Sequence, residues 1–157
     1  MSLYSYDKLI EQTRKLAAEF RRTTGTMLPV SGEIARYDVA HHLGLELTQD
    51  SSAGFDAIGQ DEREGMRIQI KSRVVGDAVR RGHRIGQLNP GGDWDLVIVS
   101  LMDDAFEPLE MYEATREDIV GAIEGANGKR SKRGALSVAK FQIIGRLVWT
   151  RELGVER

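Results

Sequence analysis

The sequence contains no cysteine, only three prolines and few aromatic residues (6%) among its 157 residues. Because cysteine is missing, a disulfide framework, thiol catalysis and zinc sites built on thiolates are excluded. No apolar run approaches the roughly 18 residues that a membrane-spanning helix needs, and the N-terminus shows no apolar signal segment. We therefore expect a soluble, cytoplasmic protein that does not interact with a membrane.

What is present is the composition of a globular protein, with 41% hydrophobic and 29% charged residues. A chain of this length is long enough for one domain with a real core and too short for two. We expect a single domain over residues 1–157, which leaves no room for a separate recognition domain. If the protein acts on a nucleic acid, its specificity for a base sequence would then be low or supplied by another subunit.

The formal net charge of -2 argues against a protein that coats nucleic acid by bulk electrostatics. The charges are nevertheless unevenly distributed. Residues 71–84 contain five lysines and arginines against one acid, whereas residues 103–118 contain seven acids and one arginine. Two interpretations stay open, a functional basic segment or an ordinary solvated surface with uneven charge.

The N-terminal part of the chain has helical periodicity. Apolar residues recur at helical spacing from Tyr6 to Arg22, and Gly25 is a suitable stop. A second helix is expected from about Gly32 to Leu43, capped by Ser31. Two helices therefore precede the first strands.

Further elements follow in the second half. Residues 74–89 combine many polar and basic residues with few apolar ones, which suggests a short helix followed by a loop. The apolar run at 96–99 predicts a strand buried on both faces. A further strand is expected at 109–112, a helix from Thr115 and a last helix from Val138 through Val148, capped by Ser137. This order predicts an α/β fold with a central mixed β-sheet flanked by helices.

The chemically most informative stretch is residues 51–73, which reads as two short strands joined by a hairpin. In the second strand Met66, Ile68 and Ile70 alternate with polar residues, so Gln69 and Lys71 project on the same side. A first strand that carries Asp56 would add a carboxylate beside them. An anion, an amide oxygen and an ammonium group would then form one metal and phosphate site.

Asp56, twelve intervening residues and then Gln69-Ile70-Lys71 resembles the signature of the PD-(D/E)XK (restriction-endonuclease-like) nuclease superfamily. The closest match is the Mrr-like branch, in which Gln replaces the second acid. The resemblance implies a restriction-endonuclease-like core and a Mg²⁺-dependent endonuclease, of restriction or repair type, that hydrolyses phosphodiester bonds in DNA. Mn²⁺ is an alternative ion, and a homodimer is expected if both strands are cut.

The resemblance also implies roles for individual residues. Asp56, the Gln69 amide oxygen and the Ile70 carbonyl would hold the metal, while Lys71 would orient or help deprotonate the attacking water. Glu33, on the helix before the first core strand, matches an acid that often joins the site, with Glu46 as a weaker substitute. The open alternative is that Glu33 only favours the helix dipole, an effect of about 0.5 kcal/mol.

Basic residues near the motif and in a glycine-rich loop could contact a phosphate backbone. The loop, residues 125–134, could equally be an ordinary solvated loop. The candidate nucleic-acid contacts are Arg73, Arg80, Arg81, Arg84, Lys129, Arg130, Lys132 and Arg133.

Gln69 is the departure that opens alternatives to catalysis. An amide brings no negative charge, so the site should bind Mg²⁺ more weakly than a site with two or three acids. The second hypothesis is therefore a weakly active or inactive nuclease-fold module that binds nucleic acid or a protein partner. A third is an assembly protein whose acidic segment, residues 103–118, docks a basic partner.

Overall fold

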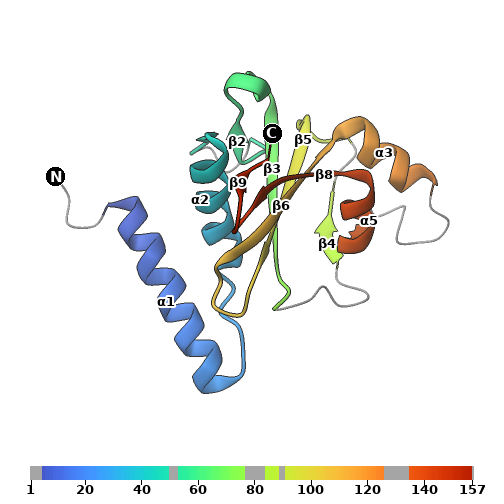
Figure 1. The fold of residues 1–157 in the computed structure, drawn as a ribbon. Helices are drawn as coiled ribbons and strands as arrows, with labels where there is room; N and C mark the ends of the chain where they lie inside the picture. Colours follow the sequence, from blue (N-terminus) through green and yellow to red (C-terminus); the bar gives the residue numbers. More distant parts are fainter. Residues whose placement is uncertain (1–4, 50–52, 77–83, 89–90, 126–134, 157) are drawn as a thin grey trace.

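A computed structural model describes residues 5–49, 53–76, 84–88, 91–125 and 135–156 of the chain (Figure 1). The helices are α1 (Tyr6–Thr24), α2 (Ser31–Leu43), the short 3-10 turn η1 (Asp61–Arg63), α3 (Arg116–Gly125) and α5 (Val138–Ile144). The strands are β1 (Glu46–Leu47), β2 (Ala57–Ile58), β3 (Arg67–Val74), β4 (Arg84–Gln87), β5 (Leu96–Met102), β6 (Pro108–Thr115), β7 (Ala135–Ser137), β8 (Arg146–Thr150) and β9 (Gly154–Val155).

Seven of the strands form one sheet in the order β1-β2-β3-β5-β6-β8-β9. Strands β3 and β5 run parallel, and the other neighbours in this sheet are antiparallel. Strands β4 and β7 pair separately. The predicted α/β class with a central mixed sheet is therefore confirmed. The predicted hairpin is present as β2 and β3, which are joined through η1.

The sheet carries helices on both faces (Figure 1). On one face α2 packs through Ile34, Ala35 and Val39 against a core that includes Ile68 and Ile98. On the other face α3 and α5 pack against the opposite side of β5. All seven residues of β5 are buried, as its continuous apolar run predicts for a strand covered on both sides.

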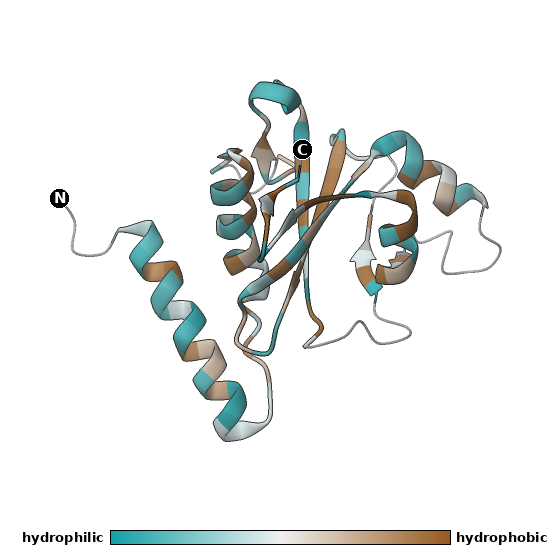
Figure 2. Ribbon diagram, in the orientation of Figure 1, coloured by the Kyte–Doolittle hydropathy of each residue, from teal (hydrophilic) through white to brown (hydrophobic). Residues whose placement is uncertain are grey.

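Helix α1 extends beyond the sheet as the most peripheral helix, and its polar and apolar residues alternate around the axis (Figures 1 and 2). Ser5 precedes its first turn and Gly25 ends it with a φ of 76°, in agreement with the predicted bounds. Its buried residues are Ile10, Arg14 and Ala17. The helix therefore rests on the body of the molecule along a narrow stripe.

The prediction of one helix from Val138 through Val148 was wrong. Helix α5 is capped by Ser137, whose side chain accepts a hydrogen bond from the Lys140 amide at 3.0 Å, but it ends at Ile144. A Cβ atom at Gly145 would lie 2.8 Å from the carbonyl oxygens of Glu113 and Phe141, so only glycine fits this close approach. After Gly145 the chain continues as β8 beside β6.

The structure of residues 74–89 was also predicted incompletely. Its described residues Arg84–Gln87 form β4 rather than a loop, and residues 77–83, where the short helix was expected, lie outside the described ranges. The strand expected at 109–112 is longer, Pro108–Thr115. Met66 precedes β3 and is 39% exposed, so it does not share the buried face of Ile68. No helix in the described ranges is both long and apolar enough to cross a membrane.

Candidate active site

The candidate site lies where β2 ends beside the longer strand β3. Asp56, directly before β2, donates its amide to the Ile68 carbonyl at 2.8 Å and accepts at its own carbonyl from the Thr48 amide at 2.9 Å. Its carboxylate oxygen Oδ2 then accepts from the Ile70 amide at 2.7 Å. The side chain thus takes over as hydrogen-bond acceptor where β2 no longer pairs with β3, and the carboxylate is held in place.

Gln69 and Lys71 lie on the same side of β3, as predicted. The strand alternates between half-buried and buried residues, with Ile68, Ile70 and Ser72 buried. The Gln69 Nε2 donates to the Gly54 carbonyl at 2.9 Å. The Gln69 Oε1 is buried and has no hydrogen-bond partner among the described residues. A buried acceptor without a protein partner is open to a water molecule, an ion or a ligand.

One pocket of about 650 Å³ brings the predicted site residues together. It lies within the size range of small-molecule and cofactor sites. The sequence-predicted residues that line it are Glu33, Asp56, Gln69, Ile70 and Lys71. Glu46, the weaker substitute for Glu33, is exposed on β1 and is not part of the lining.

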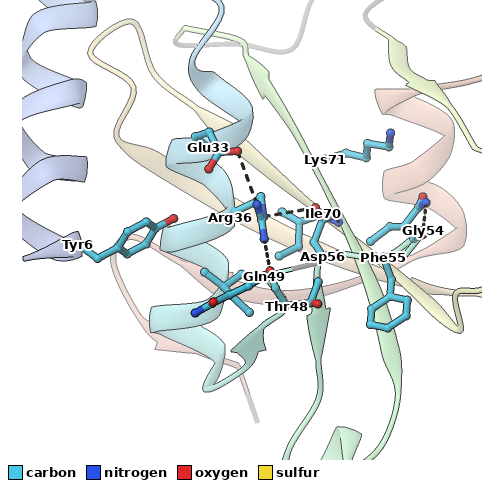
Figure 3. A pocket seen from close by; sticks show the side chains of 12 residues that line it. Tyr6, Glu33, Arg36, Thr48, Gln49, Gly54, Phe55, Asp56, Ile70 and Lys71 are labelled. Carbon is cyan, nitrogen blue, oxygen red and sulfur yellow. Dashed lines mark hydrogen bonds and ion pairs between the residues drawn. The ribbon is translucent and has the colours of Figure 1, made fainter. Parts of the chain in front are cut away.

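Arg36, which the sequence analysis did not single out, occupies the space between the two carboxylates (Figure 3). Its Nε lies 3.4 Å from Oδ1 of Asp56, and its Nη1 lies 3.6 Å from Oε1 of Glu33. Its Nη2 donates to the Thr48 carbonyl at 2.9 Å. The three-residue spacing of Glu33 and Arg36 on one helix was the signal that could have found this pair.

Lys71 points away from Arg36 in the pocket (Figure 3). The described part of the chain offers its ammonium group no hydrogen bond or ion pair. Arg36 and Lys71 therefore place two cations in the same pocket as Asp56. Such an arrangement can bind an anion as well as position a carboxylate.

Two residues on opposite sides of the pocket, Tyr6 and Phe55, add aromatic surface that sequence reasoning missed (Figure 3). Tyr6 reaches the pocket from α1 and is 46% exposed. Burial of its hydroxyl, followed by the negative charge of Glu33, raises the pKa of Tyr6, so this group is protonated at neutral pH. No local pattern marked Tyr6, because its place depends on how α1 packs.

The oxygen donors of the pocket are of the kind that Mg²⁺ prefers. They are the Asp56 and Glu33 carboxylates, the unpartnered Gln69 Oε1 and the Ile70 carbonyl, which faces the same edge of β3 as the Ile70 amide. Within the described ranges, no three His, Cys, Asp or Glu side chains come close enough together to hold a metal ion. The donor set fits a hard cation, with two carboxylates rather than three.

The predicted nucleic-acid contacts are only partly described. The Arg73 guanidinium donates to the Ser72 carbonyl at 2.6 Å and also to the Arg84 carbonyl on β4, and burial lowers its pKa. It is thus committed to the main chain, because β4 packs beside β3. The predicted contacts that lie outside the described ranges are Arg80, Arg81, Lys129, Arg130, Lys132 and Arg133.

Several acids of the segment 103–118 are paired with arginines from elsewhere. Asp103 is bound by Arg151 at 2.7 Å, and Glu113 contacts Arg63 and Arg146. With Asp104 beside Arg21 and Glu107 beside Arg14, four of the seven acids lie beside cations that are distant in the sequence. An acidic docking face, the third hypothesis, receives no support from this arrangement.

No protein-family model matches this sequence, and no curated protein is significantly similar to it.

Proposed function

We propose that this protein is a metal-dependent endonuclease of the PD-(D/E)XK type that hydrolyses phosphodiester bonds in DNA. The observation that carries the proposal is that Asp56, Gln69 and Lys71, which resemble the family signature, line one pocket together with Glu33. A restriction-endonuclease-like core is part of the same proposal.

The residues of the pocket would have separate roles in metal binding and in hydrolysis. Asp56, anchored through three hydrogen bonds, and the free Gln69 Oε1 would hold Mg²⁺, with the Ile70 carbonyl as a further donor. A bound Mg²⁺ would neutralise charge that develops on the phosphate during attack. Lys71, which has no partner among the described residues, would orient the attacking water and offset the negative charge of the phosphate.

The test is cleavage of plasmid and single-stranded DNA by the pure protein with Mg²⁺, with Mn²⁺ and with a chelator. Cleavage should need the ion and should fall at least about a hundredfold in Asp56→Asn and Lys71→Met. Asp61→Asn is the matched control for Asp56→Asn. It lies in the same hairpin outside the pocket, at a φ of 53° that Asn tolerates, and should cleave like the wild type.

A result in which both pocket variants cleave like the wild type would show that the site is wrongly assigned. Folding of each variant is checked by circular dichroism and thermal unfolding, so that loss of cleavage is not confused with loss of structure.

The second candidate is a nuclease-fold module that binds nucleic acid or a protein partner without cutting. It is favoured by the two-carboxylate donor set and by Arg36 beside Asp56, because both weaken a metal site. Salt-sensitive DNA binding that needs no metal, with no cleavage under Mg²⁺ or Mn²⁺, would support this candidate over the first.

A further inference from the structure

Arg36 is positioned as a positive charge shared by the two carboxylates of the pocket. Its guanidinium lies 3.4 Å from Asp56 and 3.6 Å from Glu33, and it is anchored to the main chain through Thr48. A divalent cation held by Asp56 and Glu33 would need the same negative charges. The guanidinium and the cation would therefore repel each other within one small pocket.

The contacts of Arg36 with the carboxylates are loose. Both distances exceed the 2.7–3.2 Å that is usual for a hydrogen bond from N–H to O, and the buried Nε has no hydrogen-bond partner in the described part of the chain. Arg14 and Asp38, by contrast, form two bonds at 2.6 and 2.9 Å through Nη2 and Nη1, although the Arg14 Nε also lacks a hydrogen-bond partner there. A loose pair can exchange one cation for another at a much smaller cost than a tight one.

We propose that Arg36 is the resident counter-ion of the pocket and that it competes with a divalent cation for Asp56 and Glu33. Arg36 is a positioning residue that lowers the metal affinity of the site, so that metal binds when a further anion, such as a substrate phosphate, joins the pocket. This inference rests on the proposed function, because it concerns the same metal site.

Direct Mn²⁺ binding to the full chain, measured by electron paramagnetic resonance without DNA, tests the inference. Arg36→Gln should lower the dissociation constant for Mn²⁺ about tenfold, since a positive charge beside the ligands is lost. Arg36→Lys keeps the charge and should stay closer to the wild type. Arg22→Gln is the matched control, because it also removes an arginine from an i,i+3 pair with glutamate on a helix, far from the pocket.

The inference is overturned if Arg36→Gln binds Mn²⁺ no more tightly than the wild type, or if Arg22→Gln shows the same gain. Equal binding by wild type and Arg36→Gln would leave the metal-dependent function standing. If Asp56→Asn binds Mn²⁺ as the wild type does, the ion sits elsewhere, and the proposed function itself loses its site. The two failures are therefore distinguishable.

A second measurement uses the unaltered protein and does not depend on how a variant folds. During a Mg²⁺ titration followed by NMR, the Arg36 Nε–H signal and the Ile70 amide signal should move together, because both groups contact Asp56. Movement of the Ile70 signal with an unchanged Arg36 signal would contradict competition. Absence of movement in both, with no Mn²⁺ binding by Arg36→Gln, would also overturn the inference.

Discussion

Helix α2 takes part in two arginine–carboxylate groups, one with Arg14 of α1 and one with its own Arg36. Arg14 and Asp38 are 5% and 2% exposed, and two short hydrogen bonds join them. The side chains of Arg36 and Asp56 are 25% and 30% exposed and lie farther apart, in a pocket. Each group leaves its guanidinium Nε without a hydrogen bond in the described part of the chain. We call the first the closed group because its side chains are buried, and the second the open group because its side chains line a pocket.

The closed group is a structural connection between α1 and the body. Burial lowers the pKa of Arg14, but the hydrogen bond from Arg14 to Asp38 and the nearby carboxylates of Asp38 and Glu107 raise it more, so the net pKa lies above its usual value. Arg14 also donates to the Phe106 carbonyl. The comparison shows that neither an ion pair nor one unpartnered atom singles out a site; what distinguishes the open group is that its unpartnered atoms, Arg36 Nε and the nearby Gln69 Oε1, belong to residues that line a pocket.

The largest effect is expected from breaking the closed group. Asp38→Ala should lower the free energy of unfolding by about 3–5 kcal/mol, because it leaves the Arg14 charge buried without its main partner. Urea unfolding followed by circular dichroism measures this loss. Asp104→Ala removes the exposed partner of Arg21 and should change stability by less than about 1 kcal/mol. If Asp38→Ala lowered the free energy of unfolding by less than about 1 kcal/mol, the buried ion pair would contribute no more than the exposed one.

Breaking the open group, which Arg36 and Asp56 form, should have a smaller effect on stability and a large effect on cleavage. Asp56→Asn keeps an oxygen that can accept from the Ile70 amide and loses only a half-exposed ion pair. The free energy of unfolding should therefore fall by no more than about 1 kcal/mol in the same urea assay. A loss as large as that of Asp38→Ala would mean that Asp56 is mainly structural.

The smallest effect concerns pH and His42, which lies near the closed group. Burial, followed by the neighbouring His41, lowers the pKa of His42 below its usual 6.5. The unfolded chain therefore binds a proton first as the pH falls, so this residue makes stability decrease from about pH 6.5 down to its lowered pKa in the folded state. His42→Gln should flatten this part of the stability profile. A wild-type profile with the same slope as His42→Gln would contradict the assignment.

Local sequence patterns predicted the elements whose signals are local. Helices α1, α2 and α3, the hairpin and the buried strand β5 all follow from periodicity, and Thr115 caps α3 as expected, by accepting from the Asp118 amide at 3.2 Å. The predicted Ser31 cap of α2 was wrong, because Ser31 is already the first residue of the helix and Val30 holds the N-cap position. The identity of β8 was missed because the helical spacing of α5 continues by coincidence through Val148. What ends the helix is the approach of Gly145 to the Glu113 carbonyl, 32 positions earlier.

The residues of the candidate site also fall into those that local patterns predicted and those that were missed. Asp56, Gln69 and Lys71 were found because one hairpin contains all three and strand alternation fixes their sides. Tyr6 was missed, since it reaches the pocket only through the packing of α1, and Arg36 was missed although its i,i+3 spacing from Glu33 was a local signal. The commitment of Arg73 to β4 likewise depends on a contact between strands that no local pattern announces.

The docking of α1 has a consequence for the dynamics of the pocket. The hydrogen bond from Arg14 to the Phe106 carbonyl joins residues 92 positions apart. Few other side chains of α1 are buried against the body of the molecule. Segments with few buried contacts detach at a lower free energy than the whole protein needs to unfold. Because Tyr6 belongs to α1, one wall of the pocket is present only while that helix is docked, and local detachment of α1 would open this side of the pocket.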